Sequence, residues 1–389
     1  MATIIRLSRV LALVLLCLPM ATSVPAFAAK ADVELGENEV KIGKDSAAEV
    51  IKDYKLSDNA ADLKRVREIG AKIVAVANKQ EVKAVYGSPK VTPFDYVFNI
   101  IEDKDVNAFS LPGGHIYVYR GLLDFVQSDH ELAGVIAHEI THASHHHMVY
   151  LLKKQASLGR VMEIALLAAM LGGARSDDVG NILYGVQFYQ IARLNGYGMQ
   201  AERDADYCGA VYTREAGYNP VGLLTFLERL AKRPEMVEYG IYRSHPLDAD
   251  RVRAAMYLIQ EMGLPLNRRD TTRAIKAEVK LETVDGVQTP GVVIEGSVIY
   301  RPAAQDGKTP DQLAKDTADS INRVLDDGLK IHELRIDREN ACVIARNKPL
   351  LLVSVADARL MGKTAAAVAM AAEAAIRNIV WKQMVNTIH

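Results

Sequence analysis

The sequence Ser-Asp-His-Glu-Leu-Ala-Gly-Val-Ile-Ala-His-Glu-Ile-Thr-His occupies residues 128–142 and decides how this chain folds. Ser128 is a favoured N-cap residue, and Glu131 three positions later predicts a capping box, so a helix is expected to begin here. Apolar residues then recur at helical spacing, among them Leu132, Val135 and Ile136. The stretch therefore predicts an amphipathic helix that buries its apolar face.

The end of this helix, His138-Glu139-Ile140-Thr141-His142, matches the pattern HExxH. Residues i and i+4 share one face of a helix, so both histidines can direct a ring nitrogen at one zinc ion. Glu139 then stands beside the ion, where it can act as the general base of a metallopeptidase. The alternative makes both histidines surface residues of an ordinary helix, but it leaves the match of every motif letter unexplained.

A catalytic zinc site needs a third protein ligand and keeps a fourth position for water. The metzincin pattern would place Gly at 145 and His at 148, and His145 and Met148 exclude that class. Glu202 and Asp206 stand four residues apart on a predicted helix, so Glu202 can bind the metal while Asp206 accepts the second N–H of a histidine ligand. Without the HExxH helix, the same residues would be interpreted as a solvated acidic face.

With these motifs in place, the chain resembles the HtpX and CAAX prenyl protease family of zinc metallopeptidases, gluzincins with HExxH, in its soluble secreted BepA-like branch. The resemblance runs from about residue 37 to 251 and rests on spaced motifs in the family's order: Asn107-Ala108-Phe109, Pro112-Gly113-Gly114, HEITH followed by His147, Glu202-x-x-Ala205-Asp206, and Ser244-His245-Pro246 with Arg251. It implies one zinc ion per chain, held by His138, His142 and Glu202. Glu139 is then the base, and Asp206 and Arg251 support the ligands. The arginine of the family's Arg-His pair is replaced by His146, so its role is unassigned.

His245 has three roles open to it. In this branch a histidine before proline lies on a loop near the metal, where it either donates to the tetrahedral oxyanion or acts as a fourth ligand in place of water. The first role makes His245 catalytic, the second keeps the protease latent until the loop moves, and the third is purely structural. The nearby run His145-His146-His147 is expected to be ordinary residues of the helix end, with a second metal site as the alternative.

The strand expected at residues 114–119 is the predicted substrate-binding element. This fold class uses an edge strand before the active-site helix to hold an extended peptide through main-chain hydrogen bonds. The alternative is an interior strand whose preceding glycines only make a turn. The residues expected to contact substrate are Gly113, Gly114, His115, Ile116 and Tyr117.

Residues 1–28 have the pattern of a signal peptide cleaved after Ala28. Arg6 and Arg9 precede an apolar run that is shorter than the ~20 residues of a membrane span. An exported, periplasmic protein is therefore expected, with no membrane span in the mature chain and peripheral membrane contact left open. Cleavage removes two of 47 basic residues and leaves 45 against 48 acidic ones, with no basic run, so nucleic-acid partners are not expected.

Periodicity predicts an α+β chain that is mainly helical with a small β-sheet at 29–265, followed by a separate small α+β domain of unknown role at 275–389. The resemblance implies that the first of these is a zincin-type metalloprotease domain. Helices are expected at 36–56, 59–80, 157–172, 181–196, 199–215, 221–231 and 248–262. The apolar stretch 161–174 is a core helix or a flap. Gly307-Lys308-Thr309 and Gly362-Lys363-Thr364 indicate a repeat with an offset of 362 − 307 = 55 residues, or a chance likeness of two helices. Cys208 and Cys342 are expected to be free thiols.

These features predict a zinc-dependent metalloendopeptidase that cleaves internal bonds of proteins or peptides. Unfolded or envelope proteins are the expected substrates, and cell-envelope quality control is the expected role. Two alternatives remain open. One is a latent or inactive zinc scaffold whose C-terminal domain binds a partner protein. The other is a structural zinc protein with a closed site of three histidines and one glutamate.

Overall fold

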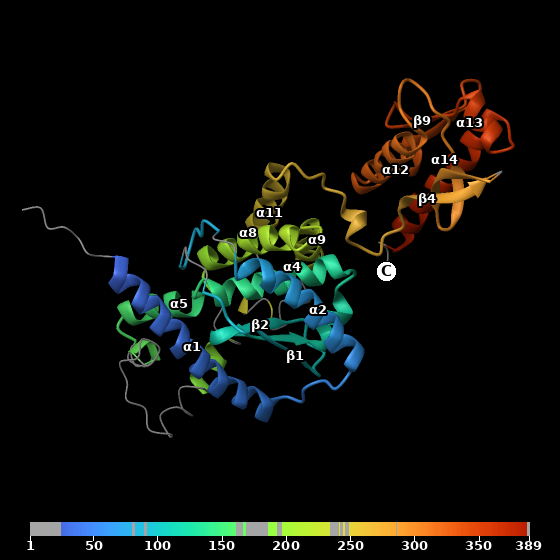
Figure 1. Cartoon of the computed structure of the whole chain (residues 1–389). Coiled ribbons are helices and arrows are strands. Elements are labelled where there is room, and N and C mark those ends of the chain that lie inside the picture. The colour runs from blue at the N-terminus through green and yellow to red at the C-terminus, as the bar shows by residue number, and fades with distance from the viewer. Residues whose placement is uncertain are drawn as a thin grey trace, which may run out of the picture.

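The computed structural model describes residues 25–79, 82–88, 92–160, 166–168, 186–192, 197–233, 241, 244–245, 249–284 and 286–386. Most of the expected signal peptide, of the stretch 161–174 and of the predicted helices 157–172 and 181–196 lies outside this part of the chain. The described elements form two units with separate hydrophobic cores, one before and one after about residue 271 (Figure 1). The expected α+β class, mainly helical and followed by a second small unit, is confirmed.

The N-terminal unit is built on a three-stranded sheet with the order β1-β3-β2. β1 (Val97–Ile101) runs parallel to β3 (His115–Tyr119), and β2 (Ala108–Leu111) runs antiparallel to β3. Side chains alternate between the two faces, so Ile116 joins the core under α2 (Ala60–Ala77) and α4 (Asp129–Ser144), whereas Tyr117 joins the core under α1 (Pro25–Asp53). Figure 1 shows α1 and the α2–α4 pair on opposite sides of this sheet.

The expectation that β3 is an edge strand is wrong. It is the central strand and is hydrogen-bonded to β1 on one side and β2 on the other, so it has no free edge for a peptide. Gly113 lies in a 3-10 turn, η1 (Pro112–Gly114), with a left-handed φ of 73° that favours glycine. A Cβ on Gly113 would lie 2.5 Å from the Val40 Cα of α1. The glycines therefore make a turn under α1, as the alternative interpretation has it.

Helix α4 is buried along almost its whole length, between α2, α8 (Met199–Glu215) and α9 (Val221–Ala231). Two glycines allow this close approach. A Cβ on Gly209 of α8 would lie 3.1 Å from the backbone nitrogen of His138, and one on Gly222 of α9 would lie 2.3 Å from the backbone carbonyl of His130. Tight contact between α4 and α8 brings the two helices that carry the predicted ligands together.

Ser128 caps α4 as expected, because its hydroxyl accepts the backbone N–H of Glu131 at 3.2 Å. The reciprocal half of the capping box is wrong. Glu131 is fully buried, and its carboxylate instead accepts the Gln127 N–H at 2.7 Å and pairs with Arg229 at 2.5 Å. A buried carboxylate is stabilised more by a guanidinium than by one backbone N–H.

The N-terminal unit also contains α3 (Arg120–Phe125), α5 (His147–Ser157), α11 (Ala249–Glu261) and η3 (Arg268–Asp270). His146, with φ of 56°, separates α4 from α5. The short η3 leads to the second unit. Its first residue, Arg268, pairs with Glu228 of α9 at 2.7 Å. The predicted helices 36–56, 59–80, 199–215, 221–231 and 248–262 are confirmed within a few residues, except that α1 begins earlier.

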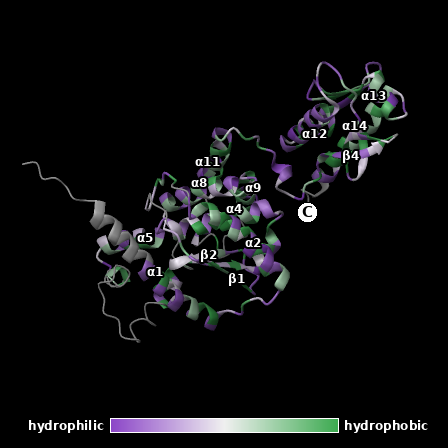
Figure 2. Cartoon of the chain, in the orientation of Figure 1, coloured by the Kyte–Doolittle hydropathy of each residue, from purple (hydrophilic) through white to green (hydrophobic). Residues whose placement is uncertain are grey.

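The C-terminal unit consists of two successive βββα arrangements. The first contains β4 (Ala277–Val284), β5 (Val287–Ile294), β6 (Ser297–Tyr300) and α12 (Pro310–Asp326). The second contains η4 (Ile331–Glu333), β7 (Leu334–Asp337), β8 (Cys342–Ala345), β9 (Lys348–Leu352), α13 (Val355–Leu360) and α14 (Ala365–Asn386). α14 begins 365 − 310 = 55 residues after α12, and β8 begins 342 − 287 = 55 residues after β5. The repeat indicated by the sequence is therefore present as structure, and the ribbon of Figure 2, coloured by hydropathy, has hydrophobic residues in the region of α14.

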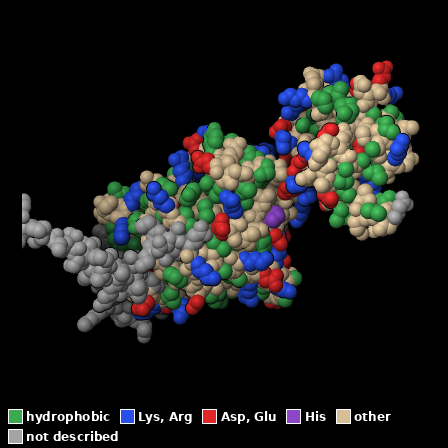
Figure 3. Space-filling view, turned by 45° about the horizontal axis from the view of Figure 1, so that its top comes forward, with side chains coloured by type: hydrophobic (Ala, Val, Ile, Leu, Met, Phe, Trp, Pro, Cys, Tyr) green, Lys and Arg blue, Asp and Glu red, His purple; other side chains and the backbone are tan. Residues whose placement is uncertain are grey.

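Cys208 and Cys342 are buried free thiols in different units, as expected. Among the described residues, no helix combines the length and the apolar character that a membrane crossing requires. Basic and acidic side chains are interspersed over the face shown in Figure 3.

Candidate metal centre

The HEITH residues and α8 bring the predicted ligands together inside the N-terminal unit. His138 and His142 project from one face of α4, and Glu202 projects from the first turn of α8 toward them. All three side chains are buried. His245, which is remote in sequence, joins the same cluster, so the structure places four nitrogen or oxygen ligand atoms within 4.8 Å of one another.

The distances among these atoms fit a tetrahedral zinc site. His138 Nε2 lies 3.0 Å from His142 Nε2 and 3.4 Å from a Glu202 oxygen, and His142 Nε2 lies 3.5 Å from the other Glu202 oxygen. His245 Nδ1 lies 3.3 Å from His138 Nε2 and 3.2 Å from Glu202. Zinc bonds of about 2.0–2.2 Å in a tetrahedron separate the ligand atoms by about 3.3–3.6 Å. The donor set and its spacing therefore suit zinc.

Asp206 and Arg251 hold two of these ligands in place. Asp206 accepts from His138 Nδ1 at 3.0 Å, which leaves Nε2 for the metal. The Arg251 guanidinium binds both Asp206 oxygens at 2.8 Å and reaches Glu202 at 2.7 Å. Both residues therefore lie in contact with the candidate ligands.

The electrostatics follow from this pairing. Burial alone lowers the pKa of His138, but Asp206 and Glu202 outweigh it and raise that pKa to about 9. Burial raises the pKa of Glu202, but the charges of His245 and Arg251 outweigh it and hold that pKa well below the usual value. Burial and the neighbouring His138 lower the pKa of His142 far below its usual value. A zinc ion bound at this centre would therefore displace a proton from His138 but not from Glu202.

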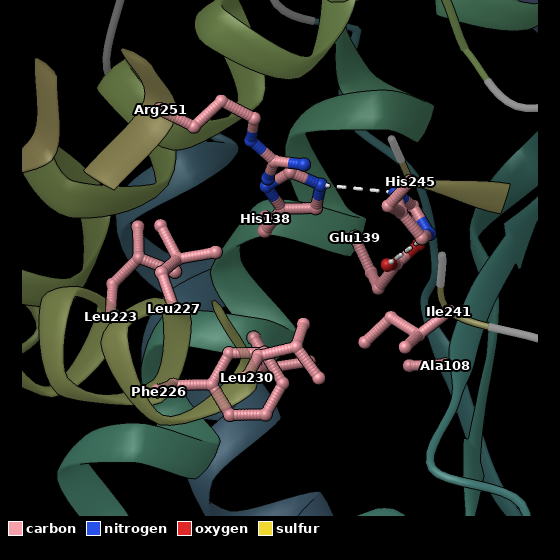
Figure 4. Close-up of a pocket in the computed structure, with 11 residues that line it drawn as sticks. Ala108, His138, Glu139, Leu223, Phe226, Leu227, Leu230, Ile241, His245 and Arg251 are labelled. Atoms are coloured by element: carbon pink, nitrogen blue, oxygen red, sulfur yellow. Dashed lines mark hydrogen bonds and ion pairs between the residues drawn. The ribbon is translucent and has the colours of Figure 1, made fainter. Parts of the chain in front are cut away.

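Glu139 and His245 face each other in the lining of an apolar pocket (Figure 4). Glu139 is buried, and its Oε1 lies 3.2 Å from His245 Nε2. Its Oε2 has no hydrogen-bond partner among the described residues. The pocket continues between α4, α9 and strand β2. Its apolar lining is Ala108, Val135, Leu223, Phe226, Leu227, Leu230 and Ile241.

Sequence reasoning missed several residues that surround the ligands. Tyr197 stacks on the His142 ring with centroids 3.9 Å apart and planes inclined by 16°. Asp204 is buried between His145 and His147, behind His142. Asp204 stands two residues from both Glu202 and Asp206, and nothing in this spacing indicates that its side chain is buried. No pattern in the sequence singles out Tyr197.

The residues predicted to bind substrate do not gather at this centre. Gly113 contacts α1, a Cβ on Gly114 would meet Phe94, and Ile116 and Tyr117 are packed into the two cores. The strand that reaches the pocket is β2, through Ala108.

Comparison with known proteins agrees with this centre. The model of peptidase family M48 matches residues 65–259, which include all four candidate ligands and Glu139. The metalloprotease LoiP of Escherichia coli K12 is 31% identical over 227 residues, which cover 53% of this chain and 83% of the relative. The beta-barrel assembly-enhancing protease of Yersinia pestis is 27% identical over 209 residues, which cover 51% of this chain and 39% of the relative.

A eukaryotic protein shows the same likeness. The mitochondrial metalloendopeptidase OMA1 of Schizosaccharomyces pombe is 26% identical over 259 residues, which cover 65% of this chain and 66% of the relative. The chain spans only about two fifths of the length of the beta-barrel assembly-enhancing proteases that it matches.

Proposed function

The chain belongs to peptidase family M48, and on that premise we propose that it hydrolyses internal peptide bonds with a zinc ion held by His138, His142 and Glu202. At the level of the family, the enzyme class expected from the sequence, a metalloendopeptidase, is confirmed. The observation that carries the proposal is the convergence of these three buried side chains at tetrahedral spacing, with Glu139 beside them.

The protein groups divide the work of hydrolysis. Bound zinc would supply a Lewis acid that polarises the scissile carbonyl and lowers the pKa of a water molecule. Glu139, whose Oε2 is buried and unpartnered among the described residues, takes the proton of the attacking water. It then passes that proton to the leaving nitrogen. Acid–base assistance of this kind contributes about 10²–10⁴-fold to the rate.

Of the three roles open to His245, the geometry favours the fourth ligand. Its Nδ1 lies where the fourth ligand of a tetrahedral site would be, and its Nε2 faces Glu139. One side chain therefore takes the position of the catalytic water and also contacts the proposed base. The His245 backbone N–H donates to the Ile241 carbonyl at 2.8 Å, so His245 is held by its own segment. We therefore take this arrangement as a latent state, which His245 must leave before substrate is cleaved.

The substrate strand is proposed to be β2 in place of β3. β2 pairs with β3 on one side only, and no other described strand pairs with its outer edge. Ala108 of β2 lines the pocket beside Glu139, which puts the outer edge next to the reacting groups. The Ser244 hydroxyl donates to the Asn107 side chain at 3.3 Å, so the segment that carries His245 lies against this strand. Movement of His245 would free the metal position and the strand edge together.

The apolar pocket predicts which peptide bonds are cleaved. Leu223, Phe226 and Leu227 of α9 line it together with Glu139 (Figure 4). An apolar side chain next to the scissile bond would bury its surface there at about 25 cal/mol per Å². Polar side chains would lose hydration without gaining partners. We therefore expect cleavage next to medium-sized apolar residues in unfolded chains.

Export and envelope substrates form part of the same proposal. The signal-peptide pattern of residues 1–28 supports export to the periplasm, and two relatives carry names that refer to β-barrel assembly. Mass spectrometry of the protein purified from cells should find a mature chain that begins at Ala29. A chain that retains Met1 would contradict the cleavage.

The catalytic assignment is tested with Glu139→Gln. This variant should bind one zinc ion per chain like the wild type, because Glu139 is not a ligand, but it should not cleave unfolded casein. Treatment of the wild type with a chelator, followed by zinc, is the matched control and should abolish and then restore cleavage. Because His245 limits the wild-type rate, the comparison is repeated with Glu139→Gln combined with His245→Ala. Casein cleavage by that double variant as fast as by His245→Ala would refute the role of Glu139.

The four-ligand arrangement also favours one alternative, a structural zinc protein. Structural zinc sites are closed by four protein ligands, whereas catalytic sites keep an open position. In that case, removal of His245 would weaken zinc binding and produce no peptidase activity. Activity in His245→Ala would exclude this alternative.

A further inference from the structure

A second cluster of ionisable side chains lies directly behind His142. It consists of His145 at the C-terminus of α4, His147 at the start of α5, and Asp204 on α8, and all three are fully buried. None of the three takes part in the proposed hydrolysis. Such a trio either binds a second metal ion or forms a hydrogen-bonded network, and the distances distinguish the two.

The atom spacing favours hydrogen bonds. His145 Nδ1 lies 2.7 Å from Asp204 Oδ2, which is a normal N–H···O distance and far shorter than the about 3.3–3.6 Å between two ligands of a tetrahedral zinc ion. The other Asp204 oxygen accepts the backbone N–H of Val85 at 2.6 Å. Both carboxylate oxygens of Asp204 are therefore occupied within the protein, and the nearest ligand atoms of the first cluster lie farther apart, at 3.0–3.5 Å.

The direction of each hydrogen bond follows from the proposed function, on which this inference rests. If His142 binds zinc through Nε2 as a neutral ring, its Nδ1 carries the proton. That N–H points at His147 Nδ1, 2.8 Å away, so His147 accepts there and carries its own proton on Nε2. The His147 Nε2–H then donates to Asp204 Oδ2 at 3.2 Å. Each donor meets one acceptor along the whole chain.

The last links complete the pattern. His145 donates through Nδ1 to the same Asp204 oxygen, and its Nε2 lies 3.3 Å from the Tyr212 hydroxyl, which can donate to it. The segment that contains Val85 closes over the network, because a Cβ on Gly87 would lie 2.4 Å from the His145 carbonyl oxygen. Buried polar groups that are fully satisfied in this way fix ring orientation and tautomer.

We propose that His147 and Asp204 are positioning residues that orient the zinc ligand His142 through the chain His142–His147–Asp204. The arrangement parallels the other ligand, since His138 donates directly to Asp206. Helix α8 would then supply one carboxylate for each histidine of the HExxH motif, directly for His138 and through His147 for His142. Such outer carboxylates make a histidine a better ligand, and their loss typically costs about 10–100-fold in metal affinity.

The test compares the zinc affinity of three variants with that of the wild type, by competition with a chromophoric chelator. His147→Leu removes the acceptor for His142 and should weaken zinc binding about 10–100-fold. His147→Asn keeps an oxygen near the former Nδ1 position and should recover most of that loss. His146→Asn is the matched control. His146 is equally buried, and its left-handed backbone suits Asn, but its ring contacts Glu39 and Thr92 and not His142. This variant should lose folding stability and keep its zinc affinity.

A second readout keeps the test independent of folding stability and activity. The visible absorption of the Co²⁺-substituted protein reports ligand geometry, and it should change in His147→Leu and return toward the wild-type spectrum in His147→Asn. Folded His147→Leu with wild-type zinc affinity and Co²⁺ spectrum would overturn the inference and leave the proposed function intact. Two zinc ions per wild-type chain would overturn it in favour of a second metal site. A wild-type chain that binds no zinc would instead refute the proposed function.

Discussion

Arg251→Met tests how the buried carboxylates of the centre are stabilised. Arg251 is 3% exposed and makes three contacts of 2.7–2.8 Å to Glu202 and Asp206, both of which are buried. Methionine fills a similar space without charge, so the variant leaves two buried carboxylates without their guanidinium. Breaking a buried ion pair in this way costs about 3–5 kcal/mol. We expect the unfolding free energy of the zinc-free protein to fall by this amount at pH 7.

The loss should depend on pH in a defined direction. In the wild type, the pKa values of Glu202 and Asp206 lie below their ordinary values of 4.5 and 3.8, with Arg251 among the causes. A carboxyl group with a depressed folded-state pKa contributes stability above its unfolded pKa and loses it as pH falls through the folded value. The difference between the wild type and Arg251→Met should therefore be largest above about pH 5 and shrink as pH falls below about 4.

Urea unfolding followed by far-UV circular dichroism measures this change, and the chain offers two controls. Trp381, the single tryptophan, lies in α14 of the C-terminal unit, so its fluorescence transition should not move. Arg203→Met removes a half-exposed pair with Asp250 at 3.9 Å and should cost less than about 1 kcal/mol. A loss for Arg251→Met no larger than that for Arg203→Met would refute the reasoning.

Three further results are expected. Because His138 has a pKa of about 9 in the zinc-free protein, it is protonated at pH 7, and zinc binding should release about one proton from it. Calorimetry in buffers of different protonation enthalpy measures this release, and finding none would contradict the prediction. Gly222→Ala places a Cβ 2.3 Å from the His130 backbone. It should lower the unfolding free energy by about 1–3 kcal/mol despite the better helix propensity of alanine. An unchanged or higher melting temperature would contradict this and would mean that α9 can shift. In the His245→Ala background, Leu227→Ala enlarges the apolar pocket. In a peptide library, the ratio of cleavage next to bulkier apolar side chains to cleavage next to smaller ones should rise by about 10-fold. An unchanged ratio would exclude this pocket from substrate binding.

The parts of the centre that depend on helical periodicity were predictable from sequence. His138 and His142 on α4, and Glu202 and Asp206 on α8, are each four residues apart, and a helix alone puts each pair on one face. The expectation that Asp206 supports a histidine ligand fits the 3.0 Å contact with His138. Local geometry therefore carried most of the information about the candidate ligands.

Long-range packing decided what the sequence could not predict. Whether the strand at His115 lies at an edge depends on pairing with β1 and β2, and its own residues are equally suited to an interior position. The contact of His147 with Asp204 joins residues 57 apart in the chain. Glu131 matched a capping box, but its burial beside Arg229 gave it a stronger partner than the cap. In each case tertiary contacts outweighed a local preference.

The central claim is that His245 closes a zinc site which is otherwise built for catalysis. The most direct measurement is the initial rate of unfolded-casein cleavage by zinc-loaded His245→Ala, compared with the wild type at equal zinc content. The distant His332→Ala, on η4 of the C-terminal unit, serves as the control. The closed geometry predicts that His245→Ala cleaves faster than the wild type and that His332→Ala does not. A His245→Ala protein that binds zinc but cleaves no faster than the wild type would contradict the claim.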